Sequence, residues 1–277
     1  MDYKGMTLDD EIGGFIRYMP QVDAYHDELI RLQAVWDNLT LLGQLSGVGG
    51  EMGNTRNAFF ELSQSLMNHL GSEYLQRIKD VLRMKGTVAV EMMQRNLFER
   101  TADIGFLATD DGIRHYMKQM PKLTQRYGEE NKQQRDHLNQ EMLRHLHEYV
   151  AKYSVYNNVL LLSPEGQVLI ALHPTGVQQS TDSLIKEALL TSEPYVEIFR
   201  HSDLLPHLKR AHIYAYRITD ESGEPLGVLC LCFNFQDECQ RIFDELNDGD
   251  WSVITLTDAT GLVIASHDPI QVPLGVQ

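Results

Sequence analysis

Apolar residues in the first half of the chain recur at the three- and four-residue intervals that are typical of amphipathic helices. This spacing predicts one helix over residues 6–45. Glycines cluster after it, and we expect them to form a loop that ends the helix and acts as a hinge. They are Gly47, Gly49, Gly50 and Gly53. A proline-free segment over residues 72–107 then predicts one long helix.

Two further helices are expected after this long helix. Thr109, Asp110 and Asp111 supply a capping side chain and negative charge for a helix start, and Pro121 is expected to lie beyond the end of that helix. A third helix is expected over residues 129–153. Its buried stripe should be Leu138, Met142, Leu146, Tyr149 and Tyr153.

After residue 153 the apolar period changes from helical to strand-like. Residues 159–162 and 168–172 flank the turn Ser163-Pro164-Glu165-Gly166, which predicts a β-hairpin, because proline and glycine suit a tight turn. The remaining expected elements are a helix over 182–190, strands over 195–200, 212–219 and 227–235, and a helix over 238–246.

The end of the chain contains a second strand-turn-strand pattern, with expected strands over 251–257 and 262–266. The string VITLTDATGLVIASHDP from Val253 is similar to VLLLSPEGQVLIALHP from Val159, although the turns differ by one residue. This similarity predicts two copies of one supersecondary unit, and the short match is also compatible with chance.

Composition and charge narrow the possible partners. The formal net charge is −15, from 24 basic and 39 acidic side chains, which repels nucleic-acid and membrane phosphates. The three cysteines form no disulfide framework, which favours a reducing compartment. No segment has the roughly 18 uninterrupted apolar residues of a membrane span, and the first residues lack signal-peptide features. We therefore expect a soluble chain without a nucleic-acid partner.

Two strings carry a family resemblance. NLFERTADIGFLATDDGIRHYM, from Asn96 to Met117, and ITLTDATGLVIASHDP near the end resemble parts of the double Cache (PAS-like) sensor region of bacterial chemoreceptor-type signalling proteins. The resemblance covers residues 72–277. The arginine, tryptophan and tyrosine cluster of the amino-acid-binding subgroup is not found, so an amino-acid ligand is not implied.

The resemblance and the pattern together predict an α+β chain with a helical N-terminal half. We expect an N-terminal helical segment over 1–71, a long helix and helical hairpin over 72–153, and a PAS-like five-stranded antiparallel Cache module over 154–249. The opening hairpin of a second, incomplete module is expected over 250–277. The soluble N-terminal segment favours a cytoplasmic location, and an excised extracytoplasmic sensor domain is the alternative.

Side chains that could carry catalysis are few. His145 and His147 lie two apart on a helix and do not share a face, so they cannot chelate one metal together. Cys230 and Cys232 share a strand face and could bind zinc with Cys239 or His212, but buried core cysteines are the favoured interpretation. Neither a phosphate-binding loop nor a nucleophile elbow is found, so we expect no enzyme activity and no cofactor.

One strand is the most informative about ligand binding. Alternation over residues 212–218 places His212, Tyr214 and Tyr216 on one face. Aromatic rings with polar tips suit a small-ligand pocket, and we expect this face to form the pocket with Tyr195 and Arg200 from the neighbouring strand. An arginine there favours an anionic ligand. The alternative is that these tyrosines cover a half-exposed sheet.

The function that we expect is signal input. A small molecule would bind the PAS-like module and shift the long helix, which would pass the signal to an output domain or a coupling protein. The long apolar stripe of the helical half predicts a homodimer. One alternative is a scaffold module that binds a partner protein and no small ligand. A second is a metal-dependent enzyme that uses the cysteine cluster.

Overall fold

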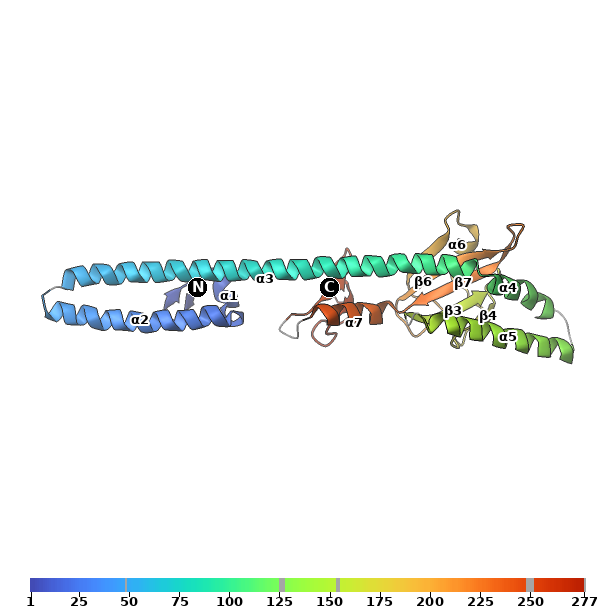
Figure 1. Cartoon of the computed structure of the whole chain (residues 1–277), viewed down its shortest axis with the longest axis horizontal. Helices are drawn as coiled ribbons and strands as arrows, with labels where there is room; N and C mark the ends of the chain where they lie inside the picture. The colour runs from blue at the N-terminus through green and yellow to red at the C-terminus, as the bar shows by residue number, and fades with distance from the viewer. Residues whose placement is uncertain (48, 125–127, 153–154, 248–251, 277) are drawn as a thin grey trace. The chain divides into compact units, whose positions relative to one another are not determined.

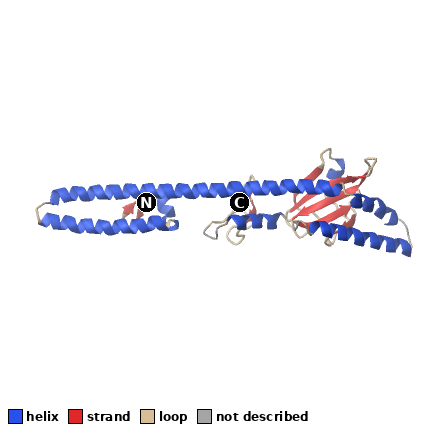
Figure 2. Cartoon of the chain, viewed as in Figure 1, coloured by secondary structure: helices blue, strands red, loops and turns tan. Residues whose placement is uncertain are grey.

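The computed structural model describes residues 1–47, 49–124, 128–152, 155–247 and 252–276. The chain divides into two compact units, Met1–Val88 and Ala89–Gln277. Helices make up most of the first unit, and the largest sheet belongs to the second, as the red strands in Figure 2 show.

The N-terminal unit begins with a small hairpin and then a helix that starts later than the sequence pattern predicts. Its elements are β1 (Asp2–Tyr3), β2 (Met6–Thr7), α1 (Asp10–Phe15), the 3-10 helix η1 (Ile16–Tyr18) and α2 (Pro20–Leu45). The prediction of one helix over 6–45 is therefore wrong. Pro20 explains the new start, because a proline lacks the N–H that a helix interior needs and is favoured in the first turn.

The long helix α3 (Gly49–Ala108) begins earlier than expected and contributes residues to both units. The expected loop and hinge through Gly53 is wrong, because the helix runs through this glycine. A glycine costs a helix about 1 kcal/mol relative to alanine, and packing of α3 on α2, as between Phe59 and Trp36, offsets this cost. In the N-terminal unit the buried apolar core comprises Met6, Leu8, Ile12, Ile16, Met19, Val22, Met67 and Leu75.

Two helices follow α3 in the second unit, α4 (Asp111–Thr124) and α5 (Glu129–Val150). The expected cap is confirmed, since the Asp110 Oδ1 atom accepts a hydrogen bond from the Ile113 N–H at 3.0 Å. Pro121 lies inside α4, which differs from the predicted end before it; burial of Met120 and Leu123 offsets the lost backbone hydrogen bond. In α5 Met142 and Leu146 are buried and Leu138 and Tyr149 are half-buried, whereas Tyr153 lies outside the described residues.

The sheet has five antiparallel strands in the order β4-β3-β7-β6-β5. They are β3 (Tyr156–Leu162), β4 (Val168–Ala171), β5 (Tyr195–Arg200), β6 (Ala211–Thr219) and β7 (Pro225–Phe233). Helices α6 (Ser183–Leu190) and α7 (Phe235–Leu246) complete this part of the unit. The predicted α+β architecture with a long helix and a five-stranded antiparallel sheet is confirmed (Figure 1).

Each face of this sheet has its own core. One face packs on α4, α5 and the end of α3, and we call it the helix-covered face; its buried strand residues include Val159, Leu161, Tyr214, Leu229, Leu231 and Phe233. The other face packs on α6 and is called the α6 face. Its buried residues include Leu160, Ala211, Ile213, Ala215, Cys230 and Cys232.

The last hairpin consists of β8 (Thr255–Thr257) and β9 (Val263–Ser266), which form a separate two-stranded sheet. Both strands agree with the predicted hairpin, although β8 is shorter than expected and Trp251 lies outside the described residues. Ala265 packs with Cys239 and Phe243 of α7. The expected domain boundaries, including a second module that opens at residue 250, stay predictions.

Candidate ligand-binding site

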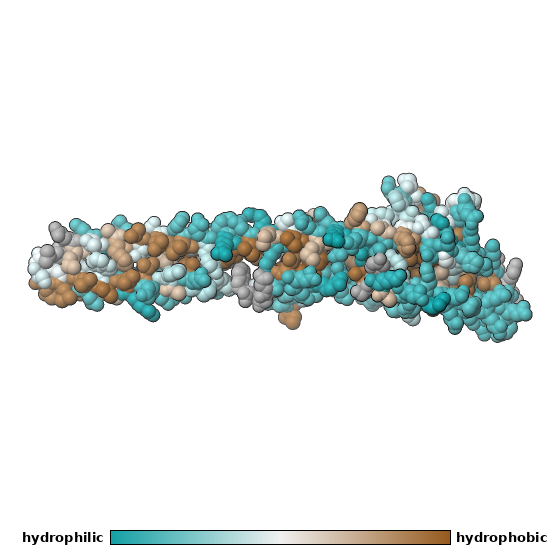
Figure 3. Space-filling model, viewed as in Figure 1, coloured by the Kyte–Doolittle hydropathy of each residue, from teal (hydrophilic) through white to brown (hydrophobic). Residues whose placement is uncertain are grey.

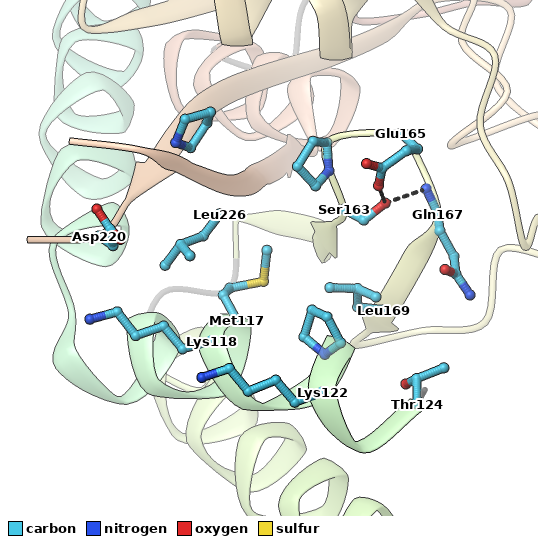
Figure 4. Close-up of a pocket in the computed structure, with 13 residues that line it drawn as sticks. Met117, Lys118, Lys122, Thr124, Ser163, Glu165, Gln167, Leu169, Asp220 and Leu226 are labelled. Carbon is cyan, nitrogen blue, oxygen red and sulfur yellow. Dashed lines mark hydrogen bonds between the residues drawn. The ribbon is translucent and has the colours of Figure 1, made fainter. Parts of the chain in front are cut away.

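A pocket of about 790 Å³ opens between α4 and the turns at one end of the sheet. Figure 4 shows Lys118 and Lys122 on the α4 side, Ser163, Glu165 and Gln167 on the β3–β4 side, and Asp220 near the β6–β7 connection. This volume lies within the range of about 300 to 1,000 Å³ that is usual for small-molecule sites. All of these residues belong to the second unit.

The α4 wall is cationic. Lys118 and Lys122 are four residues apart on the helix and therefore lie on the same side. The Lys118 Nζ atom lies 3.0 Å from the Glu221 Oε1 atom, and the side chain of Glu221 is 95% exposed, so this ion pair is weak and easily exchanged. Lys122 makes no ion pair with any residue that the structure describes. The pocket thus has two ammonium groups available to a ligand.

The turn between β3 and β4 forms the opposite wall and is held by its own hydrogen bonds. The Ser163 hydroxyl donates to the Glu165 Oε2 atom at 2.8 Å and accepts from the Gln167 N–H at 3.2 Å (Figure 4). Gly166 has a φ of +89° at the end of this turn. These bonds hold the Ser163 hydroxyl, the Glu165 carboxylate and the Gln167 backbone N–H in place before any ligand binds.

Asp220 marks the third side of the pocket, at the start of the connection between β6 and β7. Its Oδ1 atom accepts hydrogen bonds from the N–H groups of Ser222 at 2.8 Å and Glu224 at 3.0 Å. Hydrogen bonding, with the Ser222 side chain as the largest cause, lowers the pKa of Asp220. The carboxylate is therefore charged at neutral pH and holds the turn that forms the rim.

The floor of the pocket is apolar and includes Met117, Leu169 and Leu226. In β7, Ile218 lies opposite Gly227 and Thr219 opposite Pro225, so Leu226 is the extra residue of a β-bulge. Gly227 has a φ of +152°, and a Cβ atom there would lie 2.4 Å from Met117 Cε and 2.1 Å from the Leu162 carbonyl oxygen. Only glycine allows α4 to approach the sheet this closely.

This arrangement suits a small molecule with an anionic group and an apolar body. The two lysines can pair with a carboxylate, phosphate or sulfate group, while the floor buries hydrocarbon. Glu165 disfavours an anion on its side of the pocket, so it orients the charged end toward α4.

The structure gathers four of the five predicted site residues into one aromatic cluster. Tyr195 lies opposite Tyr216, and the Tyr214 ring lies 4.9 Å from the His212 ring and 6.0 Å from the Tyr195 ring. The cluster lies on the helix-covered face. Tyr214 is buried because Ile104 and Leu107 of α3 belong to the same core.

Arg200 lies apart from this cluster, on the α6 face. It is five positions from Tyr195, so strand alternation turns the two side chains to opposite sides. Its guanidinium makes a bidentate contact with Asp182, at 2.7 and 3.1 Å. Burial would raise the pKa of Asp182, but the hydrogen bonds from Arg200 and other groups outweigh it, and the pKa is lowered. Asp182 also accepts from Leu184 N–H, so the pair anchors the start of α6.

Two polar residues near this cluster, Glu197 and Arg100, are not among the residues predicted from the sequence. The Glu197 Oε1 atom lies 2.7 Å from His212 Nε2, and this hydrogen bond is the main reason that the pKa of Glu197 is lowered. Strand alternation from Tyr195 could have identified it. Arg100 of α3 is buried, with its guanidinium carbon 5.5 Å from the Tyr156 ring and 5.8 Å from the Phe233 ring. Its place four residues before Ile104, on the apolar stripe, was the available signal.

The cysteines do not form the zinc site that was weighed as an alternative. Cys230 and Cys232 lie on the α6 face, whereas His212 lies on the helix-covered face and Cys239 lies in α7. Burial raises the pKa of the Cys239 thiol to about 12 and that of both strand cysteines above its usual range. Protonated thiols in separate places are poor zinc ligands.

No helix in the described part of the chain combines the length and apolarity that crossing a membrane requires.

Comparison with known proteins gives structural but not sequence similarity. No protein-family model matches the chain. No curated protein matches it in sequence. The sensor domain of the histidine kinase DctB from Vibrio cholerae is similar with a TM-score of 0.51 and 13% identity, over 70% of this chain and 68% of that one.

Two other solved structures have lower TM-scores. The ligand-binding domain of the Campylobacter jejuni chemoreceptor Tlp3, in complex with L-valine, has a TM-score of 0.46 and 17% identity, over 76% of this chain and 77% of that one. The periplasmic domain of Vibrio cholerae LuxQ has a TM-score of 0.45 and 12% identity, over 69% and 82% of the two chains.

The expected cytoplasmic location is wrong, because similar structures are extracytoplasmic, as the periplasmic domains of LuxQ and of Chlamydia trachomatis RsbU illustrate. The expectation depends on the soluble N-terminal segment and on three cysteines without a disulfide framework, and neither feature reports on the compartment. The structural similarity to DctB agrees with the resemblance found in the sequence. This chain has the α+β fold of a Cache-type sensor domain.

Proposed function

We propose that this chain is the extracytoplasmic ligand-sensing region of a bacterial signal-transduction protein. The observation that carries the proposal is the pocket of about 790 Å³ between α4 and the sheet, walled by Lys118 and Lys122. The similar DctB structure is a histidine kinase sensor domain, which supports the same class of function. The output domain or coupling protein that receives the signal is part of the proposal.

The ligand is a small organic anion. Its charged group pairs with Lys118 and Lys122, and its apolar part lies on Met117 and Leu226. The exchange of the exposed Glu221 carboxylate for the ligand frees Lys118 at little cost. This assignment replaces Arg200 as the source of anion selectivity, since Arg200 is paired with Asp182.

The signal passes from α4 to α3. Only Thr109 and Asp110 separate the two helices, and the Asp110 carboxylate both caps α4 and lies 3.2 Å from His145 Nε2 of α5. Ile104 of α3 shares its core with Met117 of α4. A ligand that draws α4 toward the sheet therefore shifts the end of α3 as well. This requires that the ligand binds more tightly when α4 is near the sheet than when α4 is farther away.

The aromatic cluster is a second candidate location for the ligand. The Tyr214 hydroxyl and His212 Nδ1 are buried and have no hydrogen-bond partner among the described residues. Polar groups of this kind usually contact water or a ligand. Tyr195, Tyr216 and Glu197 would then line its approach from the edge strand β5.

A homodimer through the helical half is also part of the proposal. In the N-terminal unit Leu32, Val35, Leu39 and Leu42 of α2 are exposed and spaced by three and four residues, as in a coiled-coil seam. Figure 3 shows brown, hydrophobic surface along these helices. A second copy of the chain would cover it. Sedimentation should show a dimer that a Val35→Glu, Leu42→Glu double variant converts to a monomer.

A thermal-shift screen of small organic anions tests the pocket. A ligand at one hundred times its Kd should stabilise the fold by about 2.7 kcal/mol, which gives a measurable increase in Tm. The Lys118→Gln, Lys122→Gln double variant should lose this increase, and Lys186→Gln on α6, which is also exposed, should keep it.

Each outcome of the screen assigns the function differently. Loss of the shift in Tyr214→Ala but not in the lysine variant would place the ligand in the aromatic cluster. No shift with any anion, together with retention of a protein partner, would support the scaffold alternative. Turnover in hydrolase or phosphatase assays would contradict the expectation that the chain is not an enzyme.

A further inference from the structure

A cluster of potential metal ligands lies on α2, in the N-terminal unit and outside the pocket described above. His26 and Asp27 follow Asp23 by three and four residues, so both lie next to it on the helix surface. Each offers one donor atom, and these atoms all lie within 4.8 Å of one another. Small side-chain rotations can bring such a set around a single ion.

His26 is oriented as a metal ligand. Its side chain is fully buried, and its Nε2 atom lies 3.1 Å from the Tyr3 carbonyl oxygen. A carbonyl oxygen only accepts hydrogen bonds, so Nε2 carries a proton, and in the neutral imidazole Nδ1 then has a free lone pair. Histidines that bind metals commonly donate their other ring N–H to a backbone carbonyl in this way.

The free lone pair of His26 is directed toward the carboxylates. Nδ1 has no hydrogen-bond partner among the residues that the structure describes. It lies 3.8 Å from the Asp27 Oδ1 atom, which is too far for a hydrogen bond. A buried acceptor that faces a carboxylate oxygen is unfavourable unless a cation lies between them.

A cation already lies between the two carboxylates. The Lys4 Nζ atom is 2.9 Å from the Asp23 Oδ1 atom and 2.9 Å from the Asp27 Oδ1 atom. Lys4 reaches them from the tight turn between β1 and β2, where it has a φ of +46°. An ammonium group cannot use the Nδ1 lone pair as a metal ion does, and the cluster of two carboxylates and one lysine keeps a net negative charge.

We propose that Asp23, His26 and Asp27 bind a divalent metal ion such as Zn²⁺, and that the ion displaces the Lys4 ammonium group. One imidazole nitrogen and two carboxylates suit zinc, whereas calcium and magnesium prefer sites made only of oxygen ligands. Displacement of Lys4 would release the hairpin of β1 and β2 from α2. The site is independent of the ligand pocket, so each proposal can fail without the other.

Calorimetric titration of the full chain with ZnCl2 tests the site. Asp27→Asn should weaken Zn²⁺ binding by at least about tenfold, because a neutral amide is a poor zinc ligand. Its control is Glu28→Gln, on the next residue, whose side chain is 63% exposed and pairs with Arg31. This control should leave the affinity unchanged, which separates the site from nonspecific binding to surface groups.

The most discriminating variant is Lys4→Met. If the ion and the ammonium group compete for the same carboxylates, removing the ammonium group should strengthen Zn²⁺ binding. The expected gain is roughly tenfold, which is the size of effect that residues in contact with metal ligands have on metal affinity. Weaker or unchanged binding in Lys4→Met, or equal binding in Asp27→Asn and Glu28→Gln, overturns the proposal. Lys4 would then be the permanent counter-ion of the two aspartates.

Discussion

The two faces of the five-stranded sheet differ in chemistry, although they are built from the same strands. The helix-covered face buries aromatic and polar groups, with Tyr214 and His212 beside Phe233 and the guanidinium of Arg100 nearby. The α6 face buries aliphatic side chains and thiols, such as Ile213 and the two strand cysteines. The core of the α6 face is therefore mainly aliphatic, whereas the core of the helix-covered face also contains polar groups that lie against the end of α3.

The largest expected effect comes from removing an aromatic ring of the helix-covered face. Phe233→Ala should lower the free energy of unfolding by about 3 to 5 kcal/mol, because it leaves a cavity and takes away a ring that faces Arg100. Urea unfolding measures this loss. Phe98→Ala, on the same helix as Arg100 but 73% exposed, should change stability by less than about 0.5 kcal/mol. Equal losses would show that the ring is not part of a packed core.

A polar substitution should distinguish the α6 face. Cys232→Ser places a hydroxyl where the surrounding side chains are apolar, and it should cost about 1 to 3 kcal/mol in urea unfolding. Cys232→Ala is the control for the lost volume. If serine is tolerated better than alanine, a hydrogen-bond partner exists on this face and the contrast between the faces is smaller than proposed.

The Glu197 carboxylate gives the helix-covered face a dependence on pH. Its pKa is lowered in the folded chain, mainly by the hydrogen bond from His212, relative to about 4.3 in an unfolded chain. The stability that it contributes is therefore present above about pH 4.3 and is lost as the pH falls through the folded-state pKa. The carboxylate is 42% exposed, so screening keeps this contribution below about 1 kcal/mol.

Unfolding measured between pH 3 and pH 6 checks this expectation. Glu197→Gln should flatten the acid limb of the stability curve, and Glu193→Gln, on an exposed residue just before β5, should not. An unchanged stability curve for Glu197→Gln would show that this carboxylate does not contribute to the pH dependence of stability.

The smallest expected effect is that of Tyr214→Phe. The Tyr214 hydroxyl is buried without a described partner, so its removal should be neutral or should stabilise the fold by up to about 1 kcal/mol. Thermal unfolding without ligand measures it. A clear loss of stability would mean that the hydroxyl bonds to ordered water or to a bound molecule, which would favour the aromatic cluster as a ligand site.

Local elements in the second unit could be predicted well from the sequence. The limits of β5 agree with the predicted strand, and Asp110 caps α4 as expected, because alternation and capping depend on neighbouring residues. The errors arose where glycine and proline were taken as strict boundaries. Helix α3 runs through Gly53 and α4 runs through Pro121, since packing outweighs a local cost of one to a few kcal/mol.

The candidate site could be predicted only in part. Alternation grouped His212, Tyr214 and Tyr216 correctly, but it does not say which sheet face the helices cover. Applied to β5, the same rule separates Arg200 from Tyr195, and this was overlooked. The pocket lies between α4 and two turns that are distant from α4 in the sequence. In the sequence alone, Lys118 and Lys122 cannot be distinguished from two solvent-exposed helix lysines, because nothing shows that these turns lie beside them.

The absence of one side chain sets the width of the pocket. Gly227 lets the Cε atom of Met117 lie where a Cβ atom would otherwise be, so α4 lies closer to β7 than any other residue at position 227 would allow. Alanine at this position would push α4 away from the sheet, because the carbonyl oxygen of Leu162 leaves the added methyl group no other room. A single substitution at Gly227 would therefore change the volume between α4 and the sheet without altering Lys118 or Lys122.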